Sequence, residues 1–283
     1  MAEKKKKRPG ILSLVLILVC LAIAGFCAYK LLEKQAEYKV GQDYYKSAWE
    51  KTLKQPKAEA EQEMTINWET WKDTDIVAWI VLDDRINYPV MQGKDNKQYL
   101  RHLPDGSYAV SGSVFLQAEC DPYFRGPHSI IYGHHMFDGT MFDHLMDYKD
   151  EKMKGHKLYL YLPDGTKRTY KLFSVVNQLF DPDAYQYAFE TGQDFIDFQN
   201  YMLKRSLYDC GGKANADSRL LSLSTCDGAL HTSNRMELTF EPDGPDYIKQ
   251  IQEPASWYQN PVQKYEEEQE KQRTADGDET GTY

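Results

Sequence analysis

Residues 157–176, KLYLYLPDGTKRTYKLFSVV, decide the fold class. Two runs rich in Tyr, Leu, Val and Phe flank Pro163, Asp164 and Gly165, which favour a tight turn, so the stretch predicts a β-hairpin. Further short β-rich runs extend this pattern in both directions, and turn residues separate them. These runs cover 76–82, 86–91, 113–116, 129–132, 220–224 and 235–240. About eight short strands predict a mainly β fold, either a barrel or a sandwich.

One helix interrupts the strands. Thr191 and Asp194 have the spacing of a capping box, and apolar residues recur after them at helical intervals. These apolar residues are Phe195, Phe198, Met202, Leu203 and Leu207. Such a stripe is typical of core packing, so we interpret this segment as a structural helix inserted into the β fold.

The N-terminus predicts a membrane anchor. Residues 1–10 contain a cluster of lysines and an arginine, and residues 11–29 carry no charge. The apolar run is long enough for the hydrocarbon core of a bilayer and longer than the core of an ordinary secretory signal peptide, which is the alternative. We therefore predict a transmembrane helix over 11–32. By the positive-inside rule, residues 1–10 are cytoplasmic and the remainder is exported across the plasma membrane.

Composition divides the exported part into three segments. Residues 33–66 are rich in Lys, Glu, Gln and Ala, and Gly41 and Pro56 punctuate them, which predicts a stalk of one or two helices. The β-rich body spans 67–240. Residues 241–283 are acidic and polar, which predicts a mostly disordered tail. The chain has a net charge of −9 although residues 1–35 are basic, so its acidic body argues against nucleic-acid binding.

Three of the five cysteines lie in the predicted exported part: Cys120, Cys210 and Cys226. Three cysteines cannot all pair within one chain, so at least one of them is a free thiol or bonds another molecule. We interpret Cys120 and Cys210 as small buried residues, with a disulfide between them as the alternative.

Cys226 is the candidate nucleophile. It ends the alternating strand 221–226, and a strand end holds a sulfur rigidly while the following loop leaves it accessible. Arg235 starts the next strand, so it returns to the same edge if the two strands pair. His134 follows the strand 129–132 and Gly133, and would complete a Cys, His and Arg site. No CxxC or HxxxH spacing accompanies these residues, so we predict neither a metal nor a cofactor.

Several motifs resemble class B sortases. They are Leu-Ser-Thr-Cys at 223–226, the arginine at 235 and Tyr-Gly-His-His at 132–135, together with segments at 83–92, 111–115 and 138–142. The resemblance covers 71–240 and includes the helix before the cysteine strand. Residues 117–120 and the acidic tail depart from the family pattern. The family has a closed β-barrel of about eight strands with N-terminal helices and an inserted helix, so the resemblance implies that fold here.

The resemblance also implies an activity. Sortases are membrane-anchored cysteine transpeptidases of Gram-positive bacteria. Cys226 would attack a Thr carbonyl in a C-terminal sorting signal of a surface protein, His134 would act as general acid and base, and Arg235 would stabilise the oxyanion. The amine of a lipid-linked peptidoglycan precursor would take the acyl group. A pilin lysine as acceptor, hydrolysis by a secreted cysteine peptidase, and an anchored binding module are the alternatives.

Neighbouring residues have supporting roles in this hypothesis. Ser224, Thr225 and Tyr132 are candidate substrate-binding residues, and we expect Ser224 to face the groove. Two further candidates are Asp227, which could orient His134, and His135, which could support the loop. His231 is the only other histidine that could compete with His134 for the acid–base role.

Overall fold

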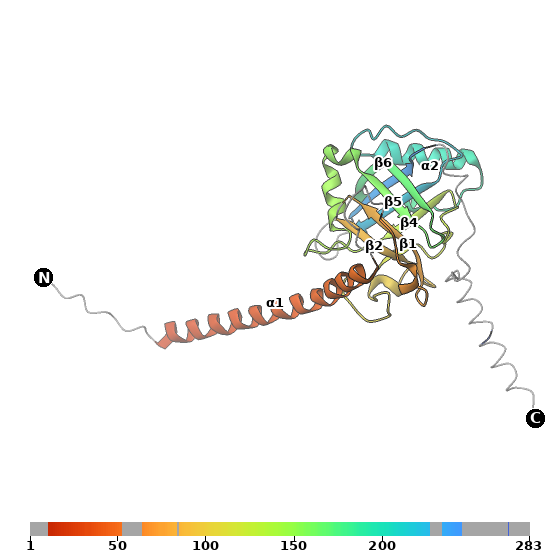
Figure 1. Cartoon of the computed structure of the whole chain (residues 1–283). Coiled ribbons are helices and arrows are strands. Elements are labelled where there is room, and N and C mark those ends of the chain that lie inside the picture. The colour runs from red at the N-terminus through yellow and green to blue at the C-terminus, as the bar shows by residue number, and fades with distance from the viewer. Residues whose placement is uncertain (1–10, 53–63, 84, 227–233, 245–270, 272–283) are drawn as a thin grey trace, which may run out of the picture.

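The computed structural model describes residues 11–52, 64–83, 85–226, 234–244 and 271 (Figure 1). Within these residues eight strands form one closed barrel, in the order β1-β2-β3-β4-β7-β8-β6-β5. The strands are β1 (Ile76–Leu82), β2 (Ile86–Met91), β3 (Val114–Leu116), β4 (His128–Tyr132), β5 (Lys157–Tyr161), β6 (Lys167–Leu179), β7 (Leu220–Cys226) and β8 (Asn234–Pro242). The predicted barrel is thereby confirmed, and the sandwich is excluded.

Six of the eight strand pairs are antiparallel, whereas β2 with β3 and β4 with β7 run parallel. The β5–β6 hairpin pairs Tyr161 with Lys167, and Gly165 in its turn has a φ of 86°, which glycine adopts without strain. Alternate strand residues point inward, as period-2 geometry requires, and fill the barrel with apolar side chains such as Ile80, Leu160 and Leu223.

Helix α2 (Gly192–Arg205) covers the outside of the barrel beside β6 (Figure 1). It begins with the predicted capping box, in which the Thr191 side chain and the Asp194 carboxylate each bond the other's backbone N–H. Its apolar face, with Phe195 and Met202, packs in a second core with Phe173 of β6. The segment between β6 and β7 is therefore anchored to the outer surface, including the short η5 (Pro182–Tyr185).

Helix α1 (Ile11–Thr52) is continuous. Its first part is long and apolar enough to cross a membrane, is not buried, and projects away from the barrel (Figure 1). The expected punctuation at Gly41 is absent, because helical backbone runs through that residue. Gly41 instead permits close packing, since a Cβ there would lie 2.3 Å from the Ser111 Oγ. The predicted Pro56 boundary lies outside the described residues.

The last turns of α1 pack against the barrel, so that part of the predicted stalk belongs to the body. Tyr45 is buried and donates a hydrogen bond to the Gly112 carbonyl (3.0 Å), and the Trp49 Nε1–H donates to the Asn87 carbonyl (2.8 Å). Both aromatic rings contact Tyr88 of β2. The hydroxyl of Tyr88 in turn accepts a hydrogen bond from the backbone N–H of Met141 (2.8 Å), in the loop after β4.

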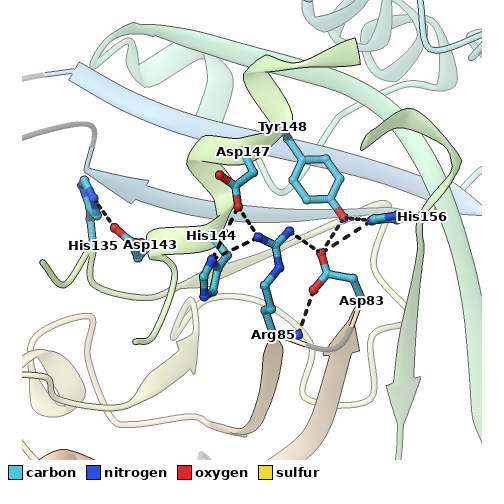
Figure 2. Close-up of polar contacts among 8 residues, drawn as sticks. All are labelled: Asp83, Arg85, His135, Asp143, His144, Asp147, Tyr148 and His156. Carbon is cyan, nitrogen blue, oxygen red and sulfur yellow. Dashed lines mark hydrogen bonds and ion pairs between the residues drawn. The ribbon is translucent and has the colours of Figure 1, made fainter. Parts of the chain in front are cut away.

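Short 3₁₀ helices lie in the described connections: η1 (Trp68–Thr70), η2 (Gln98–Leu100), η3 (Asp143–Lys149) and η4 (Glu151–Gly155). Figure 2 shows the polar cluster that ties η3 to the β1–β2 turn. Arg85 bridges Asp83 and Asp147 of η3, and Asp83 also lies 3.6 Å from the His156 Nδ1. The cluster fixes the position of η3, whose first residue is Asp143.

Gly112 offers a test of the close packing below η2. Its φ is 54°, and a Cβ there would lie 2.4 Å from the Tyr99 carbonyl oxygen, whereas Gly106 (φ 81°) has open space around it. We expect Gly106→Ala to lower the free energy of unfolding by roughly 1–2 kcal/mol through backbone strain alone. Gly112→Ala should cost a further ~1–3 kcal/mol because of the clash. Denaturant titration of the full chain in detergent measures both; equal losses would contradict the packing.

Candidate active site

The strands β7 and β8 bring Cys226 and Arg235 together. Their antiparallel register places Cys226 directly opposite Arg235 and Ser224 opposite Glu237. The two strands are therefore neighbours, which is what the prediction for Arg235 required. The connecting residues 227–233 lie outside the described part of the chain, and so do the candidates Asp227 and His231.

The strand β4 brings His134 to the same edge. β4 runs parallel to β7, with Tyr132 opposite Ser224, and the Gly133 N–H extends the pairing to the Ser224 carbonyl (3.2 Å). Parallel strands end at the same edge of a sheet, so His134 follows β4 at the level where β7 ends. A Cβ at Gly133 would lie 2.6 Å from the Phe142 ring, so only glycine fits before His134.

A cavity of about 240 Å³ opens at this edge. The predicted residues Tyr132, His134, Ser224, Thr225 and Arg235 are all among those that line it. Side chains from β4, β7 and β8, far apart in the sequence, thus surround one space. Pockets with apolar walls and a few convergent polar groups are typical of binding sites.

His134 is partly buried in the cavity wall, and its Nε2 lies 2.8 Å from the Leu100 carbonyl oxygen. That oxygen only accepts hydrogen bonds, so Nε2 carries the proton. Burial lowers the pKa of the imidazole below its usual value, and Arg101 adds to this, while the bond to Leu100 acts in the opposite direction. The ring is therefore mostly neutral at neutral pH, with Nδ1 as its basic nitrogen.

The Arg235 side chain lies at the cavity with two described contacts. Its Nη1 donates to the Asn234 carbonyl (3.0 Å), and the guanidinium lies over the Phe180 ring, 5.7 Å from the ring centre. Cations favour this position because the face of an aromatic ring is electron-rich. Sequence reasoning did not identify Phe180, which follows the end of β6 and has no local motif.

Tyr185 of η5 is a second residue that the sequence did not reveal. Its hydroxyl lies 2.9 Å from the Ser224 Oγ, and its ring stacks on Tyr132 with ring centres 6.1 Å apart. The Tyr132 hydroxyl donates to the Gln117 Oε1 (2.7 Å). Ser224 and Thr225 are both buried, and both line the cavity. They differ in that the Ser224 hydroxyl contacts Tyr185.

His135 points away from this group. Its Nε2 lies 2.6 Å from the Asp143 Oδ1 at the start of η3, as Figure 2 shows. The loop after His134 is further held by a hydrogen bond from the Phe142 N–H to the His134 carbonyl (2.9 Å). The contact with η3 is consistent with the supporting position expected for His135.

The other described thiols of the body are less suited to nucleophilic chemistry. Cys120 and Cys210 are both free, so the alternative of a disulfide between them is wrong. Burial raises the pKa of Cys120 to about 12 and also raises that of Cys210. Because the thiolate is the nucleophile, neither residue is poised to react at neutral pH.

Comparisons with known proteins agree with this arrangement. The sortase domain family matches residues 82–239. Sortase B of Listeria monocytogenes is 33% identical over 155 residues, which are 54% of this chain and 63% of that protein, slightly under two thirds of its length. Sortase B of Staphylococcus aureus is 31% identical over 163 residues, covering 57% of this chain and 67% of that protein.

A solved structure described as a Staphylococcus aureus sortase B–substrate complex has a TM-score of 0.58 and 26% identity. The alignment covers 75% of this chain and 96% of that one. With a closed eight-stranded barrel, a family match across the body and sortase B relatives in both sequence and structure, the chain belongs to the sortase family, in its class B.

Proposed function

We propose that this protein is a cysteine transpeptidase that cleaves a C-terminal sorting signal after threonine and transfers the acyl group to the amine of a peptidoglycan precursor. One observation carries the proposal: Cys226 lies opposite Arg235 at the edge of the barrel where His134 lines the same cavity. The staphylococcal relative described as a sortase B–substrate complex supports the binding of a substrate by this fold.

In the first step, the Cys226 thiolate attacks the threonine carbonyl and forms a tetrahedral intermediate. Negative charge develops on the carbonyl oxygen, and the Arg235 guanidinium, positioned across from Cys226, stabilises it. Collapse of the intermediate breaks the peptide bond after threonine and leaves a thioester on Cys226. The leaving amine must gain a proton, because an amide anion is too poor a leaving group.

His134 supplies that proton, after its Nδ1 has taken the proton of the Cys226 thiol to give the thiolate and an imidazolium. Its lowered pKa makes the protonated ring a strong acid, and its partly buried position keeps bulk water from competing. In the second step, neutral His134 takes a proton from the incoming amine through Nδ1 while the amine attacks the thioester. A new amide forms, the thiolate of Cys226 is released, and the imidazolium is regenerated.

The walls of the cavity would bind the substrate backbone beside the scissile bond. Tyr132, Ser224 and Thr225 are the residues we assign to this role, with Tyr185 stacked on Tyr132 to form a continuous surface. The rings supply apolar area, and the Ser224 hydroxyl offers a hydrogen bond that it now makes with Tyr185.

We assign the catalytic domain to the outer face of the plasma membrane. The apolar first part of α1 would span the bilayer once, with basic residues 1–10 on the cytoplasmic side. This places the active site where cell-wall precursors carry amines. The surface protein that bears the sorting signal would be the second partner.

The topology makes a direct prediction. The full chain should remain with the membrane fraction after carbonate extraction, and protease added to intact protoplasts should digest the body. Deleting residues 11–32 should move the protein into the soluble fraction. A body protected from added protease in intact protoplasts, yet digested after lysis, would contradict the orientation.

Catalytic variants test the mechanism. With a sorting-signal peptide and an amine, Cys226→Ala should abolish ligation, because the thioester cannot form. His134→Ala should cost more than tenfold in kcat/KM, and Arg235→Ala on the order of a hundredfold, the usual effect of removing an oxyanion donor. Arg235→Lys is the matched control: it keeps the charge without the planar fork, and should retain more activity than Arg235→Ala.

Product analysis by mass spectrometry separates the alternatives. Ligated peptide supports transfer, cleaved peptide without ligation indicates a hydrolase, and absence of both contradicts the proposal. Supplying a pilin lysine peptide in place of the precursor amine tests the polymerising alternative in the same assay. Full activity in Cys226→Ala would exclude this residue as the nucleophile.

Tyr132 tests the substrate-binding surface. Tyr132→Ala removes the ring that lines the cavity and stacks on Tyr185, so KM should rise about tenfold or more while kcat changes less. Tyr132→Phe removes only the hydroxyl that bonds Gln117 and should change KM much less. Steady-state kinetics measure both, and equal effects of the two substitutions would refute a role for the ring.

A further inference from the structure

Glu237 is a buried acidic residue directly below the proposed active site. It is 2% exposed, lies opposite Ser224 and follows Arg235 by two residues on β8. Side chains alternate along a strand, so Glu237 and Arg235 point to the same face of the barrel, roughly 7 Å apart along the strand. Ser224 and Arg235 both line the cavity, whereas Glu237 is not among the residues that line it.

The surroundings of Glu237 offer hydrogen bonds without an ion pair. From β7, the Ser222 hydroxyl lies close enough to lower the pKa of this carboxyl, and it contacts the His128 Nε2 of β4 (2.8 Å) and the Thr239 hydroxyl of β8 (2.9 Å). Tyr132 of β4 is close enough to sense its charge. On the other side, β6 places the apolar Val176 opposite it.

The Oε1 of Glu237 has no hydrogen-bond partner among the described residues, and no described basic side chain forms an ion pair with this carboxyl. His128, the nearest described histidine in this network, is itself kept neutral, because burial lowers its pKa to about 4. The Tyr185 hydroxyl contacts the Ser224 Oγ, opposite Glu237. Arg235 is the only basic residue of β8, and it shares this face with Glu237.

An unpaired carboxylate in this environment is costly, so the protonated form is favoured. Burial raises the pKa of Glu237 to about 8, and the Ser222 hydrogen bond opposes this only in part. Glu237 is therefore mostly uncharged at pH 7 and becomes a carboxylate as the pH rises through about 8. An ionised carboxylate and the guanidinium would then share one face of β8.

We infer that Glu237 is a positioning residue for Arg235: uncharged, it leaves the guanidinium at the cavity, and once ionised it draws the guanidinium inward, away from the reacting carbonyl. The inference rests on the proposed function of Arg235. The contacts described for Arg235 include a backbone carbonyl and an aromatic ring. A hydrogen bond between a guanidinium and a buried carboxylate is stronger than one to a neutral carbonyl.

Glu237→Gln tests the inference, because glutamine has the same shape and cannot ionise. The ratio of kcat/KM for this variant to that of the wild type should be constant below pH 7. Above about pH 8 the ratio should rise by about tenfold per pH unit, since only the wild type loses Arg235 from the cavity. The ratio cancels the titration of Cys226 and His134, which both proteins share.

Glu241→Gln is the matched control. Glu241 lies on the same strand and pairs with Lys171 at the surface, so its ratio to the wild type should stay flat at all pH values. In an Arg235→Ala background, Glu237→Gln should also give a flat ratio, because no guanidinium remains to be displaced. A flat ratio for Glu237→Gln in the native background, or the same rise without Arg235, would overturn the inference.

A second measurement needs neither activity nor a folded variant. In wild-type protein labelled with ¹³C at the glutamate carboxyl, one buried resonance should titrate near pH 8, and the Arg235 Nε resonance should shift with it. Titration of every glutamate between pH 4 and 5 would overturn the inference. If the wild type ligates no peptide, the proposed function fails, whereas this titration still decides whether Glu237 controls Arg235.

Discussion

The site depends on the pairing of β7 with two different neighbours. β7 runs parallel to β4 on one side and antiparallel to β8 on the other. An edge where two parallel strands end is also the edge where an antiparallel neighbour begins. Hydrogen-bond register therefore brings His134, Cys226 and Arg235 to the same edge of the barrel, although 92 residues separate the first two in the chain. Any change that shifts this register by one residue would turn the side chains to opposite faces.

Local signals predicted most of the elements. The eight strands, the turn at Gly165 and the capping box at Thr191 depend on residues close in sequence, and each is present. The sequence could also predict that Cys226 and Arg235 lie at one edge of the sheet, since strands that are neighbours in sequence commonly pair. The continuity of α1 through Gly41 could not be predicted, because the sequence alone does not show that Ser111 packs against that glycine.

The residues that the sequence did not reveal are held by tertiary contacts. Phe180 and Tyr185 lie in the connection between β6 and α2. Phe180 contacts the Arg235 guanidinium, and Tyr185 contacts the Ser224 hydroxyl. The burial of Glu237 has the same origin, since β8 alternates polar and apolar residues and both faces are covered. From the sequence alone, an acidic residue in such a strand is expected to face solvent, because the sequence does not show which elements cover the outer face of the barrel.

The continuous α1 has a geometric consequence. Tyr38 packs against the core of the body, and Gln42 donates a hydrogen bond to Asp138 in the loop after β4, so the body holds the helix from Tyr38 onward. Lys30, at the end of the apolar stretch, lies eight residues before Tyr38, roughly 12 Å along a straight helix. With α1 in the membrane as proposed, this continuous helix would set both the distance and the tilt of the active-site edge relative to the bilayer surface. Substrates would then have to reach that edge at a fixed distance from the membrane.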